Sequence, residues 1–210
     1  MQGNCFEGTE MARLATIRSM LMSGRHRLDV GRAREVAKLV LAQPRKTGQL
    51  VECLWDEDAG VANRAADALE RASYHRPSLA AKWTESLIGL MAEAEQNKLR
   101  WNLALAIPRL DLNVAESRRV AAALRSYLED RSSIVKTAAM HGLADLTRHD
   151  RSLLPEVLDL LRVLSRSGTP AMRARGRILL RKLEGPNPRV AAFRKAPALR
   201  ITTVTQRKRV

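Results

Sequence analysis

Apolar residues recur along this chain at intervals of three and four positions, the spacing of helix faces that pack on a core. Capping residues and prolines interrupt the pattern at regular intervals. Asp29 is expected to cap the helix that begins at residue 30, Pro44 to end that helix, and the acidic turn up to Asp58 to precede the helix that begins at residue 59. No segment alternates apolar and polar residues with the β-branched and aromatic side chains typical of strands. The pattern therefore predicts five helix pairs, over residues 11–23 and 30–42, 46–55 and 59–73, 78–95 and 97–110, 114–129 and 132–148, and 152–165 and 169–184.

The second helices of the last four pairs share one plan. Each begins on an apolar residue (Val61, Leu99, Val135 or Met172), which a small or apolar residue follows four positions later and an apolar one eight positions later. The starting positions are 38, 36 and 37 residues apart. A fixed period of this size is typical of repeat arrays, in which stacked helix pairs bury faces that one pair cannot cover. The sequence thus predicts an all-α fold, an α-solenoid of about five antiparallel helix pairs.

The best copies also share an acidic turn before the second helix. Residues 56–58 are Asp-Glu-Asp and precede Val61, Ala65, Ala66 and Leu69, while Asp130 precedes Val135, Ala138, Ala139 and Leu143. Over residues 11–184 this plan resembles HEAT-like, armadillo-type helical repeats. The resemblance implies a right-handed solenoid and a non-catalytic scaffold that mediates protein–protein interaction through its concave face, without a cofactor. It does not indicate the partner or the oligomeric state.

Two segments flank the predicted repeat domain. Residues 1–10 are predicted to be a flexible N-terminus, and residues 185–210 a basic C-terminal tail. The tail carries seven basic residues and no acidic one. A segment of this composition cannot bury enough apolar surface to fold on its own.

The whole chain is strongly basic, with a formal net charge of +15 and arginine at 29 of its 37 basic positions. One interpretation is a GC-rich genome, which favours arginine codons; the other is a polyanionic partner such as nucleic acid. Basic residues near the starts of the second helices could line up as a ridge that follows a phosphate backbone, or could each pair with the acid of the preceding turn. The candidate binding residues, for a protein partner or for phosphate, are Arg64, Arg100, Trp101, Lys136, Arg173, Arg175 and Arg177. Nucleic-acid binding through the last pair and the tail is the alternative function.

No motif indicates catalysis or a metal, because the chain has no glycine-rich phosphate loop and no zinc-binding His-Glu-x-x-His sequence. Cys5 and Cys53 are too few for a disulfide framework, and we expect a buried Cys53 and a cytoplasmic protein. The chain has no long apolar run that would span a membrane. Some HEAT-like arrays resemble alkylpurine DNA glycosylases, which hold DNA with tryptophans and a carboxylate. Trp101 and Asp111 suggest this further alternative, but no residue is assigned a catalytic role.

Overall fold

The computed structural model describes residues 16–23 and 29–185, and every element in this part of the chain is helical. The predicted N-terminus 1–10, residues 11–15 of the first predicted helix and nearly all of the predicted tail lie outside the described residues. The α-helices are α2 (Ile17–Met22), α3 (Ala33–Ala42), α4 (Thr47–Glu52), α5 (Ala59–His75), α6 (Thr84–Glu93), α7 (Asn97–Ala106), α8 (Val114–Tyr127), α9 (Ser133–Leu146), α10 (Leu154–Ser167) and α11 (Pro170–Glu184). Short 3₁₀ helices join them: η2 (Pro44–Lys46), η3 (Cys53–Trp55), η4 (Pro77–Trp83), η5 (Ile107–Arg109) and η6 (Arg151–Leu153).

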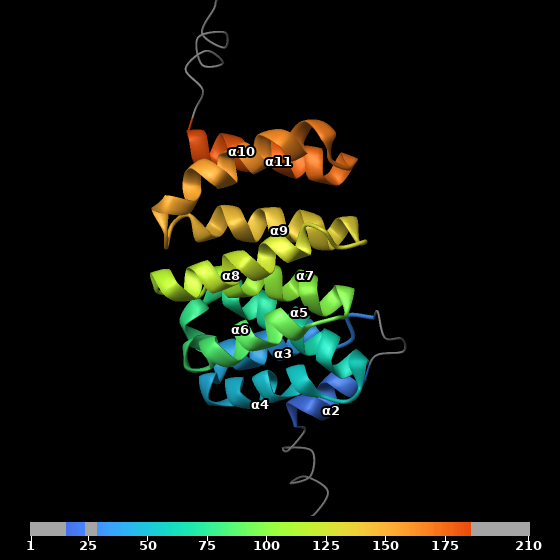
Figure 1. Cartoon of the computed structure of the whole chain (residues 1–210). Coiled ribbons are helices and arrows are strands. Elements are labelled where there is room, and N and C mark those ends of the chain that lie inside the picture. The colour runs from blue at the N-terminus through green and yellow to red at the C-terminus, as the bar shows by residue number, and fades with distance from the viewer. Residues whose placement is uncertain (1–15, 24–28, 186–210) are drawn as a thin grey trace, which may run out of the picture.

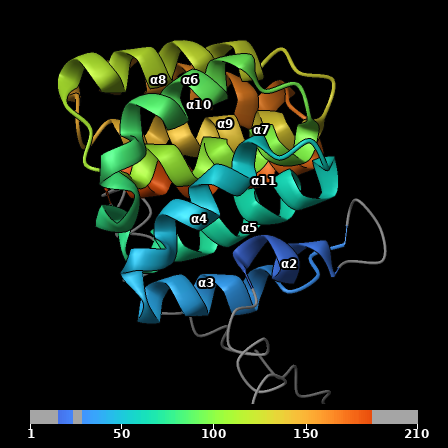
Figure 2. The ribbon, with the colours of Figure 1, turned by 90° about the horizontal axis from the view of Figure 1, so that it is seen from below.

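The helices form two rows, which we call the odd row (α3, α5, α7, α9 and α11) and the even row (α2, α4, α6, α8 and α10). Each odd-row helix packs on the next odd-row helix and on the even-row helix that precedes it in the chain. Figure 1 shows the stack rising from α2 and α4 to α10 and α11. Figure 2 looks along the stack and separates α6 and α8 from α7 and α9. Among the described helices, none combines the length and the apolar character that crossing a bilayer requires.

Capping side chains fix where most helices begin. The Asp58 carboxylate accepts hydrogen bonds from two backbone N–H groups in the first turn of α5, and Asn113 and Glu116 form a capping box at α8. Asp29 was the expected cap of α3, and this expectation is wrong. Its carboxylate instead accepts a hydrogen bond from Gly31, whose positive φ of 47° turns the chain, and α3 begins two residues after Gly31.

The apolar pattern of the odd row becomes the core. We number positions in α5, α7, α9 and α11 from their shared apolar residue, so that Val61, Leu99, Val135 and Met172 are position 0. All residues at positions 0 and 4 are buried. Position 7 faces the preceding helix and position 5 the following one, because a Cβ on Gly142 (position 7) would lie only 2.5 Å from the carbonyl oxygen of Ala104 (position 5 of α7).

Gly142→Ala should therefore destabilise the protein although alanine is the better helix former. We expect the free energy of unfolding to fall by about 1–2 kcal/mol, because the overlap with the Ala104 carbonyl outweighs a propensity gain of up to about 1 kcal/mol. Gly89→Ala in α6 is the matched control, since a Cβ at Gly89 meets nothing within 4 Å. Urea unfolding should show a stabilised Gly89→Ala protein. Equal gains in both variants would contradict the close packing of α7 and α9.

Candidate binding face on the odd row

Positions 3, 6 and 10 of the odd-row helices share one side of the array, which we call the odd face. Lys182 and Asp145, both at position 10, form an ion pair of 2.9 Å between α11 and α9. His141, at position 6, is close enough to Arg109 and Arg175 for their charges to lower its pKa. The odd face thus comprises Arg64, Asp67 and Arg71 of α5, Asn102, Leu105 and Arg109 of α7 and η5, Ala138, His141 and Asp145 of α9, and Arg175, Ile178 and Lys182 of α11.

The α5 part of the odd face is covered. Arg64 is only 3% exposed, and its Nε donates a hydrogen bond to the carbonyl of Leu21 at the end of α2. Asp67 and Lys98 are also buried; burial lowers the pKa of Lys98, and the nearby carboxylates of Asp67 and Asp29 oppose that shift. Since Leu21 and Asp29 flank the α2–α3 connection, the chain itself closes this end of the face.

Over α7, α9 and α11 the odd face is open in part: Asn102 and Ala138, at position 3, are buried, while Leu105 and His141, at position 6, are half-buried and Ile178 is 49% exposed. Trp101, at position 2 of α7, is half-buried and packs against the core. The face therefore presents apolar side chains on α7 and on α11, with His141 of α9 at the same position between them and the half-buried Arg175 one turn from Ile178.

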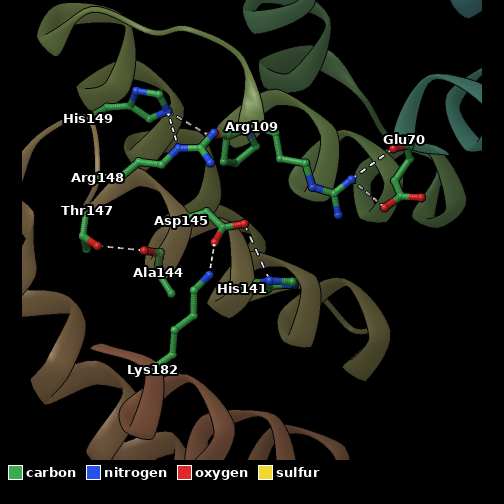
Figure 3. A network of polar contacts seen from close by, with 10 residues as sticks. Glu70, Arg109, His141, Ala144, Asp145, Thr147, Arg148, His149 and Lys182 are labelled. Carbon is green, nitrogen blue, oxygen red and sulfur yellow. Dashed lines mark hydrogen bonds and ion pairs between the residues drawn. The ribbon is translucent and has the colours of Figure 1, made fainter. Parts of the chain in front are cut away.

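His141 and Lys182 share the carboxylate of Asp145 (Figure 3). Burial lowers the pKa of the His141 imidazole; Asp145 opposes this, while Arg175, Arg109 and Lys182 lower the pKa further. A lowered pKa favours the neutral form of the His141 imidazole. Lys182 is paired with Asp145 and Arg109 with Glu70, so Arg175 is the arginine of this part of the face that has no ion-pair partner among the described residues.

Arginines also bind backbone carbonyl groups of the preceding pair (Figure 3). Arg109 donates to the carbonyl oxygen of Glu70 in α5 at 3.0 Å and forms an ion pair of 2.8 Å with its carboxylate. Arg148 donates to the carbonyl of Pro108 in η5 at 3.0 Å. These arginines tie successive pairs together.

The predicted basic ridge is only partly present. Arg100, Lys136 and Arg173 do share one register, position 1, but Arg64 does not belong to it, because Ala62 holds that position in α5. A shift of two residues turns a side chain by about 200° around a helix. Arg64 consequently lies inside the protein, and the expected row of surface cations does not include it.

The expected pairing of these cations with the acid of the preceding turn differs from one cation to the next. Lys136 lies close enough to Asp130, the acid of its preceding turn, for its charge to lower the pKa of that carboxyl group. Arg100 donates to the carbonyl of Ala94 in the preceding turn, but its carboxylate partner is Asp130 in the following turn, at 2.6 Å. Its guanidinium also lies 5.2 Å from the ring centre of Tyr127. Other ion pairs join residues about one helix pair apart: Arg18–Asp56, Arg109–Glu70, Arg118–Asp150, Arg119–Glu85, Arg125–Glu156 and Lys182–Asp145.

The arginines of α11 separate onto two surfaces. Arg175, at position 3, lies on the odd face. Arg173 and Arg177, at positions 1 and 5, are exposed on the side that in α5, α7 and α9 packs against the next helix. In those helices position 5 is Ala66, Ala104 and Met140, all buried. These two arginines make that side of α11 polar.

Sequence reasoning missed a group of cations at the ends of α3 and α5. Arg45, Arg76 and Lys82 line a hollow beside Trp83, which the sequence placed on an ordinary packing helix. The signal was present as two Pro-containing turns, Gln43-Pro44-Arg45 and Arg76-Pro77, one after each helix. Their proximity follows only from the parallel stacking of the two helices.

The remaining reactive groups have structural surroundings. Cys53 is buried, as expected, and burial raises its pKa to about 11. Among the described residues, no three His, Cys, Asp or Glu side chains lie close enough together to hold a metal ion. Asp111, the carboxylate of the glycosylase alternative, is exposed after η5. Comparison with protein-family models, curated proteins and solved structures found no match to this chain.

Asp130→Asn should destabilise the protein by about 1–3 kcal/mol, since it removes the charge that pairs with Arg100 from a largely buried carboxylate. Burial alone would raise the pKa of Asp130, but hydrogen bonds from the Ser132 N–H and from Arg100 more than offset this, and the pKa is lowered. A lowered carboxyl pKa stabilises the fold above the unfolded-state value of about 3.9, and this contribution disappears as the pH falls through the folded-state pKa.

Urea unfolding of wild type and Asp130→Asn between pH 7 and pH 3 measures this contribution. The difference between them should be largest at neutral pH and should shrink below about pH 4. Asp159→Asn is the control, because Asp159 is 76% exposed and its partner Arg162 also binds Glu184. Its effect should stay below about 0.5 kcal/mol. Equal losses in both variants would show that Asp130 has no special role.

Proposed function

We propose that this protein is a non-catalytic, right-handed α-solenoid of HEAT-like repeats, a scaffold that binds a protein partner on the open part of the odd face. The observation that carries the proposal is the set of partly exposed apolar side chains on and beside the odd face, Trp101 and Leu105 on α7 and Ile178 on α11, with Arg175 one turn from Ile178. Aromatic side chains and arginine are enriched at the cores of protein interfaces. A partner segment with an apolar side and acidic residues matches this set.

The internal use of charge supports a scaffold. Polar groups that could carry chemistry, such as Asp130, Asp145 and Glu70, hold cations from neighbouring helix pairs. Buried small residues bring the odd-row helices together. Repeats built in this way present a wide surface whose shape is set by the stack. In this proposal the concave face of the solenoid is the odd face.

A site-specific photo-crosslinker tests the surface. A photoreactive residue in place of Leu105, on the odd face, should give a discrete ultraviolet-dependent adduct when the protein is expressed in its native host. The same residue in place of Ala122, exposed on α8 of the even row, should not. Arg175→Glu in the Leu105 probe protein should lower the adduct yield severalfold, because it reverses a charge at the interface. Both probe proteins must melt at similar temperatures.

Digestion of the adduct distinguishes the partner classes. A protein partner leaves an adduct that protease shortens and nuclease does not, and mass spectrometry then identifies it. A nuclease-sensitive adduct, or equal adducts at positions 105 and 122, would exclude a protein partner on the odd face.

A second candidate function is nucleic-acid binding through the last pair and the tail. The observation that favours it is the row of Arg173, Arg177 and Arg181, exposed along α11 and without a carboxylate partner among the described residues. These cations precede the basic segment 189–209 in the sequence. Contacts of this kind bind phosphate without reading sequence.

Fluorescence anisotropy with labelled duplex DNA over a salt series tests this candidate. The full chain should bind at low salt, and its affinity should fall with salt by a slope of about 0.9 per phosphate contact. A chain ending at Glu184 should bind more weakly and with a smaller slope. Absence of binding by the full chain at low salt would eliminate this second candidate and leave the protein scaffold untouched.

A further inference from the structure

A solvent-open hollow of about 530 Å³ lies where the ends of α3 and α5 meet the turns that follow them. Pro44, Arg45 and Gly48 line one side, and Arg76, Ser78, Leu79, Lys82 and Trp83 line the other. Arg45, Arg76 and Lys82 are all exposed, and none has an ion-pair partner in the described part of the chain. No carboxylate lines the hollow. Three cations therefore surround an open space with nothing to neutralise them.

Two other hollows show the contrast. One of about 430 Å³ between α3 and α5 includes Glu70, and its Arg71 binds Asp67 at 2.9 Å. Another of about 340 Å³ beside α2 includes Glu52 and Asp56, and its Arg18 binds Asp56 at 2.6 Å. Each contains its own acid and a paired arginine. The hollow at Trp83 differs in chemistry, since all of its formal charge is positive.

The walls of this hollow are held in place by the backbone. Gln43 (φ −129°, ψ 78°) and Arg76 (φ −145°, ψ 83°) both precede a proline and lie outside the helical region, which this position disfavours. A 3₁₀ helix follows each proline, and η4, from Pro77 to Trp83, has seven residues where runs beyond three or four are uncommon. The Trp83 ring lies against α4, where a Cβ on Gly48 would be 3.3 Å from its edge. Gly48 thus leaves room for the indole ring in the wall.

From this arrangement we propose that the hollow binds a nucleotide, with its phosphate held by Arg45, Arg76 and Lys82 and its base against Trp83. Arginine's planar fork matches the oxygens of a phosphate, and lysine adds a point charge. Bases stack on aromatic side chains without regard to sequence. The proposal goes beyond the scaffold function and concerns a different surface, so either can fail alone.

The nucleotide belongs to a single strand of nucleic acid. The neighbouring hollow between α3 and α5 lies next along the surface, because its His75 directly precedes Arg76. Its Glu70 is paired with Arg109 and its Arg71 with Asp67. Arg34 and Lys38 of this hollow have no ion-pair partner in the described part of the chain. Cations that continue beyond one phosphate suit a polymer, whereas a free mononucleotide would use only the first three. Strand binding of this type depends strongly on salt.

The test compares binding of a fluorescein-labelled twelve-residue oligothymidylate and of ATP to the full chain. Arg76→Gln/Lys82→Gln should weaken oligonucleotide binding at least about tenfold and lower its salt slope by about 0.7, the value for one phosphate contact on a single strand, because the three cations hold the same phosphate. Arg131→Gln/Arg166→Gln removes the same charge from two other exposed positions and should change affinity less than about threefold. ATP should bind at the same hollow, more weakly than the strand.

Trp83 gives a second readout that the basic tail cannot mimic, since residues 186–210 contain no tryptophan. Saturating oligonucleotide should quench the part of the tryptophan fluorescence that comes from Trp83. In Trp83→Phe this quenching should be absent, while the phenyl ring still fills the wall of the hollow. Circular dichroism melting confirms that each variant is folded. Three results would each overturn the proposal. The two double variants could bind the oligonucleotide equally well, or quenching could be unchanged in Trp83→Phe. Polyglutamate could also displace the labelled oligonucleotide as readily as the unlabelled strand does. ATP binding equal to strand binding would overturn the assignment to a polymer.

Discussion

The close approach of neighbouring helices in the odd row is the constraint on which the rest of the structure depends. At Gly142 and Ala104 the side chains are so small that α9 packs almost directly on the backbone of α7. Small residues at such points let helix backbones approach, and a side chain added there would force them apart. Because successive helices are in contact along the row, their ends align. The cations and carboxylates at those ends then come within reach of the adjacent pair.

Those aligned ends explain how the chain uses its many arginines. Arg100, Arg109 and Lys182 each bind a carboxylate that lies one helix pair away, and Arg109 and Arg148 also bind backbone carbonyl groups of the preceding pair. Two groups of cations without an ion pair among the described residues lie elsewhere. Arg173 and Arg177 are exposed on the side of α11 that in the other odd-row helices packs against the next helix. The three cations around Trp83 surround an open hollow.

Much of this could be predicted from particular residues. Val61, Leu99, Val135 and Met172 gave the period and the helix pairs, and all four are buried. Asp58 and Pro44 marked helix boundaries correctly, because capping and the missing proline N–H act locally. The location of Arg64 was predicted wrongly, because it was aligned with Arg100, Lys136 and Arg173. Those three residues are at position 1 of their helices, whereas Arg64 is at position 3 of α5. Asp29 was misassigned because Gly31 turns the chain before the helix begins.

The sequence by itself determined that the described part of this protein is helical, where most of its helices start and end, and which faces are apolar, because these properties depend on neighbours within one or two turns. It did not separate η4 (Pro77–Trp83) from α6, which begins at Thr84. Only the tertiary structure decided which charge meets which. Asp130 pairs with Arg100, thirty residues earlier, and Arg64 binds the carbonyl of Leu21 in α2 at one end of the odd face. It also brought Arg45 to the same hollow as Arg76. Partners so far apart in the chain meet only after the stack has fixed the distance between helices.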